Sequence, residues 1–118
     1  MKSLSLIYKK FWEERKEYFE NYLEWAKRIK ETARELIGED VKVIVFGSVV
    51  RKDWTPASDI DVLIISDNLS KNWEENRWLR TEIKKRIGPF SPFQIHLATP
   101  EEFAGWWKNF IKKDYLEI

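Results

Sequence analysis

The sequence predicts a small α/β domain, and three observations support this prediction. The N-terminal third, up to Gly38, has apolar residues at helical spacing and contains no internal Gly or Pro. Three short apolar runs, at residues 41–46, 59–66 and 93–98, have the composition of strands. Helix signals lie between and after these runs. The expected order is α-β-α-β-α-β-α, which places helices on a short sheet in a single domain of residues 1–118.

The N-terminal segment, residues 1–38, is expected to be helical from about Ser3 to Ile37. Its apolar positions recur at helical spacing, three, four or seven residues apart: Leu4, Ile7, Phe11, Tyr18, Tyr22, Trp25, Ile29, Ala33 and Leu36. A helix of this length exceeds the typical globular helix. The segment is therefore either two helices or one helix with an exposed end.

Two later helices have recognisable start signals. One begins after Ser70 or Asn72, because Asn72 and Glu75 have capping-box spacing, and Gly88-Pro89 ends it. Its expected apolar face consists of Trp78, Leu79, Ile83 and Ile87. The second, the C-terminal helix of residues 100–118, begins with the box Thr99-Pro100-Glu101-Glu102. It carries Phe103, Trp106, Trp107, Phe110 and Ile111, with one Trp ring expected to stay exposed as a docking surface.

Composition restricts the classes of function. Hydrophobic residues make up 43% of the 118 residues, which indicates a folded protein with a real core. The 21 basic and 20 acidic side chains leave a net charge of +1, so neither nucleic acid nor a membrane is an expected partner of the whole surface. The absence of Cys and the single His argue against disulfides and structural zinc. With no apolar run typical of a signal peptide or membrane span, the expected location is the cytoplasm.

The most informative motif places Gly47-Ser48 after the first strand and Asp59-Ile60-Asp61 at the start of the second. Residues two apart in a strand project from the same face, so the two aspartates would lie side by side. A divalent cation, Mg²⁺ above all, is the usual reason to tolerate two such close carboxylates. The Gly-Ser turn would offer backbone N–H groups to an anion. Together these features indicate metal-assisted phosphoryl or nucleotidyl transfer.

This motif resembles the signature of the DNA polymerase β-type nucleotidyltransferase superfamily, most closely its minimal nucleotidyltransferase (MNT) branch. The resemblance covers about residues 41–99. It implies a polymerase β-like nucleotidyltransferase fold, with a small mixed β-sheet flanked by helices, here preceded by a long N-terminal helix. It also implies that Asp59 and Asp61 bind the Mg²⁺ that holds a nucleoside triphosphate, most often ATP. Gly47 and Ser48 would receive its β and γ phosphates.

Four neighbouring residues have two interpretations each. Arg51 is either a bidentate phosphate ligand or a surface arginine. Ser58 either contacts phosphate or fixes the loop, and Asp53 either caps the loop or has a functional role. Lys52 departs from the family, which commonly has Gly there. Either the loop adopts positive φ less readily with Lys52, or this lysine adds a phosphate contact.

A larger departure concerns the third carboxylate, which in the family lies on the following strand as a base or metal ligand. Here that strand reads Phe93-Gln94-Ile95-His96-Leu97, with Gln94 and His96 on one face. We expect Gln94 at the third-acid position, where its neutral amide can ligate a metal but cannot act as a base. His96 either substitutes as the catalytic base or is an ordinary strand residue bonded to its neighbours.

Two functions follow as hypotheses. The first is an Mg²⁺-dependent nucleotidyltransferase that moves AMP from ATP to an acceptor hydroxyl. As the MNT resemblance implies, the acceptor would be a Tyr on a HEPN-type toxin partner, and this protein the antitoxin. The second is a weakly active or inactive binding module that neutralises a partner by direct contact or forms homo-oligomers. An aminoglycoside-modifying or RNA end-adding enzyme is less favoured, because each normally needs a further domain.

Overall fold

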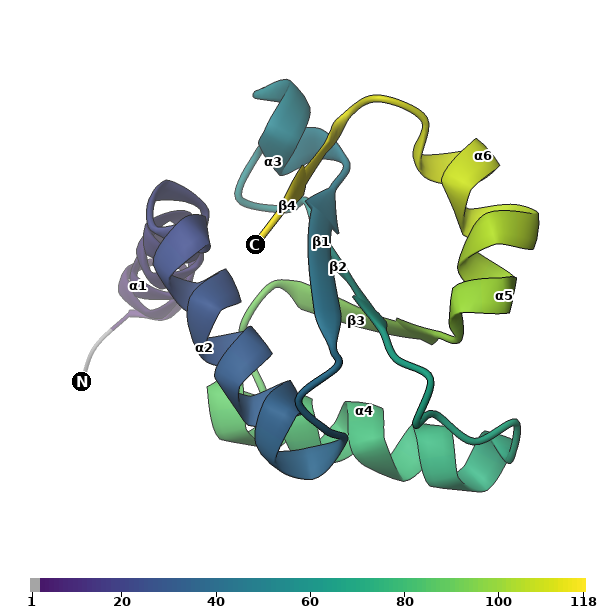
Figure 1. Cartoon of the computed structure of the whole chain (residues 1–118). Coiled ribbons are helices and arrows are strands. Elements are labelled where there is room, and N and C mark those ends of the chain that lie inside the picture. Colours follow the sequence, from purple (N-terminus) through teal and green to yellow (C-terminus); the bar gives the residue numbers. More distant parts are fainter. Residues whose placement is uncertain (1–2) are drawn as a thin grey trace.

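The structure is a computed structural model that describes residues 3–118, and its centre is a four-stranded mixed sheet (Figure 1). The strands are β1 (Lys42–Phe46), β2 (Ile60–Ile65), β3 (Phe93–Ala98) and β4 (Tyr115–Glu117), in the order β3-β2-β1-β4. β1 is antiparallel to both β2 and β4, whereas β2 and β3 are parallel. The expected mixed sheet flanked by helices is confirmed, and β4 is an addition that the sequence did not predict.

Helices cover both faces of this sheet (Figure 1). Alternating strand residues such as Val43, Val45, Val62 and Ile64 pack on one face against buried residues of the N-terminal helices and the helix before β3. The other face, which includes Ile44, Phe46 and Leu63, is covered by residues of the C-terminal helical segment. This period-two division of the strands is what buries both faces of the sheet.

The N-terminal segment forms two helices, α1 (Leu4–Glu20) and α2 (Tyr22–Leu36), which meet at Asn21. Asn21 leaves helical geometry at φ −116° and ψ 26°, and its side chain donates to Glu17 O at 3.0 Å. Such local side-chain bonds compete with helix continuation. The first half of α1 is exposed, including Leu4, Ile7 and Phe11. Residues 1 and 2 of the predicted segment lie outside the described residues.

α4 (Trp73–Ile87) has Asn72 as its N-cap and Gly88 as its C-cap, so it starts at the second of the two predicted positions and ends as predicted, with two differences. Asn72 accepts from the N–H groups of Glu74 and Glu75, but its own N–H donates to Ser70 Oγ at 2.7 Å. The reciprocal half of the predicted capping box is therefore replaced by Ser70. Trp78 is 57% exposed, whereas the other three residues of the predicted apolar face, Leu79, Ile83 and Ile87, are buried.

The predicted C-terminal helix of residues 100–118 is shorter and irregular. It consists of α5 (Pro100–Glu102), a π-helical segment η1 (Phe103–Trp107) and α6 (Lys108–Ile111), after which the chain turns into β4. The predicted capping box of Thr99 and Glu102 is present. Trp106 is 56% exposed and Trp107 is half-buried, which confirms that one Trp ring stays outside the core. β4 forms because the free edge of β1 offers unpaired backbone groups.

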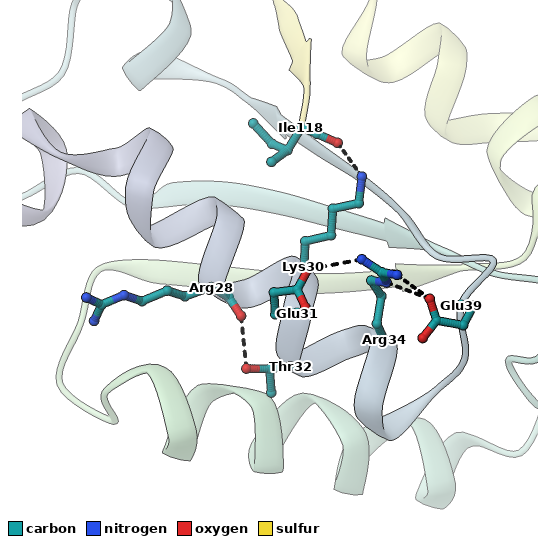
Figure 2. Close-up of polar contacts among 7 residues, drawn as sticks. All are labelled: Arg28, Lys30, Glu31, Thr32, Arg34, Glu39 and Ile118. Carbon is teal, nitrogen blue, oxygen red and sulfur yellow. Dashed lines mark hydrogen bonds and ion pairs between the residues drawn. The ribbon is translucent and has the colours of Figure 1, made fainter.

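The C-terminal residues are tied to α2 by side-chain contacts (Figure 2). Lys30 Nζ donates to Ile118 O at 2.7 Å, and the Ile118 N–H donates to Val43 O at 2.9 Å. Arg34, one turn along α2, contacts both Glu31 and Glu39. The Lys30 contact ties α2 to the residue after β4, whereas the Arg34 contacts lie within α2 and the turn that follows it. Within residues 3–118, no helix combines the length and apolar character needed to cross a membrane.

Candidate active site

The predicted motif residues line one open cleft of about 540 Å³, which lies where β1 ends and β2 begins. Its wall includes Gly47, Ser48, Arg51, Ser58, Asp59 and Asp61, together with Phe46, Phe110, Ile111, Lys112 and Asp114. Asp59 is exposed and Asp61 is half-buried. The structure therefore brings together both aspartates, the Gly-Ser turn, Arg51 and Ser58, which lie up to fourteen residues apart in the sequence.

Gly47 makes the sharp turn between β1 and the short helix α3 (Ser48–Arg51). Its φ of 88° and ψ of −153° favour glycine over any residue with a side chain. The N–H groups of Val50 and Arg51 both donate to Gly47 O at 3.1 Å, which fixes the start of the turn. Because β1 and β2 pair at Phe46 and Asp61, the turn leaves the sheet directly beside the Asp61 carboxylate.

The loop of residues 52–58 carries the chain from α3 to Asp59, and α1 holds it in place. Arg15 Nε donates to Pro56 O at 2.7 Å, and Arg15 Nη2 donates to Ser58 O at 2.8 Å. Trp54 of the loop stacks on the buried ring of Phe19, with ring centroids 4.6 Å apart. The position of Asp59 therefore depends on contacts that two residues of α1, a helix remote in sequence, make with the loop.

The loop also has internal contacts that bear on two predicted residues. Ser58 Oγ accepts from the Thr55 N–H at 3.0 Å, so this hydroxyl fixes the loop. Arg51 Nε lies 3.3 Å from Asp53 Oδ2, which holds the guanidinium at the edge of the cleft. Lys52 adopts φ 67° and ψ 24°, so the loop does take the left-handed conformation despite lacking glycine there. Lys52 does not line the cleft.

From β3, the side chain that reaches Asp61 is that of His96. Its Nε2 lies 3.3 Å from Asp61 Oδ1, and its ring packs 5.1 Å from that of Trp107. Gln94 pairs with Asp61 in the sheet register, but its exposed side chain lines a different cavity, beside Arg80 and Lys84. The geometry thus differs from the expectation that Gln94 stands at the third position. The right-handed twist between neighbouring strands gives a physical reason, since a register partner need not point at the same target.

Comparison with known proteins agrees with this geometry. The family model described as a nucleotidyltransferase domain matches residues 26–117, which is more than half of the chain. The chain belongs to the nucleotidyltransferase domain family. The match includes the whole cleft and excludes all of α1. No curated protein matches the chain significantly.

Two solved structures resemble this nucleotidyltransferase domain. One, described as a "putative nucleotidyltransferase", is 34% identical over 78% of this chain and 95% of its own, with a TM-score of 0.53. The other, described as a "putative nucleotidyltransferase from Sulfolobus solfataricus", is 23% identical over 80% of this chain and 83% of its own, with a TM-score of 0.39. The first supports the family assignment in sequence and in fold.

The donor atoms of the nucleotidyltransferase cleft fit Mg²⁺. This ion is usually bound through one or two carboxylates and substrate phosphates, and Asp59 and Asp61 supply two carboxylates in one open cleft. Among residues 3–118, no three His, Cys, Asp or Glu side chains converge on a common metal position. The protein alone therefore offers an incomplete coordination shell, which the phosphates of a bound nucleotide would complete.

Three residues of the site were missed by sequence reasoning. Arg15 lies in a helix outside the motif, and no local pattern connects it with the loop of Asp59. Lys112 and Asp114 line the cleft because β4 returns the chain beside β1, and β4 itself has only three residues. Lys112 has φ 60° and ψ −124°, a strained conformation for a residue with a side chain. A cation and a third carboxylate thus enter the cleft from the C-terminal turn.

Proposed function

We propose that this nucleotidyltransferase domain transfers AMP from ATP to an acceptor hydroxyl in an Mg²⁺-dependent reaction. The observation that supports the proposal best is the shared cleft of Asp59, Asp61 and the Gly47-Ser48 turn. The resemblance to the MNT branch extends the proposal to its biology. In that extension the acceptor is a Tyr on a HEPN-type toxin, and the protein acts in the cytoplasm as the antitoxin.

The residues of the cleft form two groups, one suited to bind the anionic phosphates and one suited to bind a cation. Ser48, Arg51 and Lys112 line it with a hydroxyl and two cations, which suit the triphosphate oxygens of ATP. Asp59 and Asp61 would hold Mg²⁺, which when bound neutralises phosphate charge and lowers the pKa of a coordinated hydroxyl. Ser58 acts here through the loop, because its hydroxyl is used by the Thr55 N–H.

The proposed transfer forms one bond to phosphorus and breaks one. The acceptor oxygen attacks the α-phosphorus, the bond from that phosphorus to the bridging oxygen breaks, and pyrophosphate leaves with the electron pair. The hydroxyl proton passes to a base. A carboxylate only accepts hydrogen bonds, so in the contact with Asp61 the proton is on His96 Nε2. We propose His96 as that base, because it is the β3 side chain that contacts Asp61.

A second candidate function has one observation in its favour. No carboxylate of β3 faces Asp61, and the described residues contain no cluster of three metal-ligating side chains. A metal site that lacks a carboxylate from β3 holds Mg²⁺ more weakly and deprotonates a hydroxyl more slowly. The second candidate is therefore a nucleotide-binding module of low activity that neutralises its partner by contact.

Calorimetric titration with ATP, in the presence and absence of Mg²⁺, tests the proposal. We expect Mg²⁺-dependent binding by the wild type and its loss in the double variant Asp59→Ala/Asp61→Ala. Asp67→Ala is the matched control, because Asp67 is an exposed aspartate outside the cleft. Binding that survives in the double variant would contradict the assigned site. Binding without transfer of label from α-³²P-ATP to a partner would favour the binding module.

A further inference from the structure

A second cavity lies beside the cleft, between α4 and β3. This α4–β3 groove has a volume of about 470 Å³ and is lined by Arg80, Thr81, Lys84, Lys85, Pro89, Phe93, Gln94 and Ile95. It lies at the rim of the sheet, because β3 is an edge strand. The family match and the proposed nucleotide site assign no role to it.

The charge of the groove has one sign. Three of its lining residues are cations and none is a carboxylate. Lys84 Nζ is occupied, since it donates to Ser91 O at 2.6 Å and also to Phe93 O, and burial lowers the pKa of Lys84. Arg80 and Lys85 form no ion pair within residues 3–118. The groove therefore offers two available cations and the Gln94 amide to an anionic ligand.

The backbone of β3 adds a second recognition element. Pro92 O accepts from the Ile60 N–H and Ala98 O accepts from the Ser66 N–H, so even-numbered residues of this strand bond to β2. In a parallel pair the alternate residues direct their N–H and C=O groups outward. Phe93 O follows this pattern, because it accepts from Lys84 on the outer side. Ile95 and Leu97 then present a row of backbone groups to which an extended peptide can pair.

The groove is also close to the reacting end of the cleft. Gln94, which lines the groove, is the register partner of Asp61, which lines the cleft. A strand added outside β3 would lie two strand spacings from β2, or roughly 10 Å. Among hydroxyl side chains, only the long side chain of tyrosine suits such a distance. A residue opposite Gln94 on the added strand would project from the same face of the sheet as Asp61.

From these observations we propose that the α4–β3 groove binds an acidic, extended peptide segment of the acceptor protein. The segment pairs with the outer edge of β3, sets its carboxylates against Arg80 and Lys85, and directs a tyrosine hydroxyl across Gln94 into the cleft. This inference rests on the proposed transfer to a protein hydroxyl. A polynucleotide is the less suitable ligand, because it has no backbone ladder to match the strand edge and the chain carries a net charge of only +1.

Fluorescence anisotropy with labelled octapeptides tests this proposal without requiring catalysis. The probe alternates Glu and Val around a central Tyr, and a second peptide has Lys in place of Glu. We expect the wild type to bind only the acidic peptide, more weakly as salt is raised. Lys85→Glu removes one exposed ion pair, which should weaken binding of the acidic peptide by up to about fivefold. Repulsion between the new glutamate and the acidic peptide should weaken it further. Lys71→Glu, an equal charge change at an exposed lysine outside the groove, should leave binding unchanged.

Two further probes separate the alternatives. An acidic peptide that is N-methylated at alternate residues lacks ladder donors, so it should bind much more weakly than the parent peptide. Equal binding of the methylated peptide, or preference for a single-stranded RNA octamer, would overturn the proposal. The variant Asp59→Ala/Asp61→Ala distinguishes the two proposals. Loss of ATP binding with retained peptide binding supports the groove, whereas loss of peptide binding in Lys85→Glu and in Lys71→Glu alike would contradict it.

Discussion

A methyl group built on Gly47 would lie 2.8 Å from Oδ2 of Asp61. The Gly47-Ser48 turn and the carboxylate of Asp61 are thus in contact, with no room for a side chain between them. The backbone of the turn approaches the carboxylate because β1 and β2 pair at Phe46 and Asp61. Glycine is therefore required at this position both for its φ and for the space it leaves.

Gly47→Ala should reduce ATP affinity and stability together. The added methyl group displaces the Asp61 carboxylate, and the backbone strain at φ 88° costs about 1–3 kcal/mol. Titration calorimetry and urea unfolding measure the two effects. Gly105→Ala is the control, because nothing lies within 4 Å of its Cβ position. Replacing a helical glycine by alanine should raise the free energy of unfolding by roughly 0.5–1 kcal/mol. Unchanged ATP binding in Gly47→Ala would contradict the assigned turn.

Lys112→Gly should raise stability while lowering ATP affinity. Glycine relieves backbone strain of about 1–3 kcal/mol. The greater freedom of the unfolded chain offsets roughly 0.4–1 kcal/mol of this gain in stability. The substitution also removes a cation that lines the cleft. Lys52→Gly relieves a similar positive φ outside the cleft, so it should raise stability without changing ATP affinity. If Lys112→Gly and Lys52→Gly lower ATP affinity equally, the proposal that Lys112 contacts the phosphates is wrong.

Arg15→Lys should weaken Mg²⁺-dependent ATP binding although Arg15 does not line the cleft. Lysine cannot reproduce the two-pronged contact with Pro56 O and Ser58 O, so the loop before Asp59 is less well held. We expect a stability loss of about 1–3 kcal/mol from the partly buried carbonyls that lose a donor. Arg28→Lys, in which a guanidinium over Trp25 is replaced, serves as the control for ATP binding.

His96→Asp should raise Mg²⁺ affinity, and Gln94→Glu should not. Of these two β3 residues it is His96 whose side chain contacts Asp61, while Gln94 lines a different cavity, so a carboxylate at position 96 would join the two aspartates. Paramagnetic resonance with Mn²⁺ as the probe ion measures the number and affinity of bound ions. If Gln94→Glu raised the affinity for Mn²⁺ more than His96→Asp does, position 94 would be the site of the third metal ligand.

Asp40 should give a measurable acid dependence of stability. Hydrogen bonds from Ser66 Oγ, the Asp67 N–H and Asn68 Nδ2 lower the pKa of Asp40 below its ordinary 3.8. The folded state therefore favours the ionised form, and the stabilisation is complete above the unfolded pKa. The stability difference between wild type and Asp40→Asn should be constant above about pH 5 and shrink as pH falls below that ordinary value. Urea midpoints at a series of pH values test this.

Most of the fold followed from local signals in the sequence. β1, β2 and β3 have the composition of buried strands, and the limits of α4 follow from Asn72 and Gly88. The features that could not be predicted depend on tertiary context. β4 has three exposed residues and exists because β1 has a free edge, while Trp78 sits at apolar spacing in α4 but remains exposed.

The candidate site followed the same division. Gly47, Ser48, Asp59 and Asp61 were predicted to meet because turn geometry and strand pairing constrain them, and all four line the cleft. The choice between Gln94 and His96 depended on the direction of side chains across twisted strands, which the period-two rule alone does not give. Arg15 acts through contacts with Pro56 and Ser58, which lie 41 and 43 residues along the chain. A single sequence contains no local signal for such contacts.

The late position of β4 in the chain has a consequence for biosynthesis. β1 is an interior strand, yet its second neighbour begins only at Tyr115, some seventy residues after β1 ends, an interval that a ribosome takes seconds to translate. During those seconds β1, β2 and β3 can pair, but one edge of β1 stays open to other nascent chains. Lys42, at the start of β1, places a charge on that edge, the usual protection of an unpaired strand against intermolecular pairing.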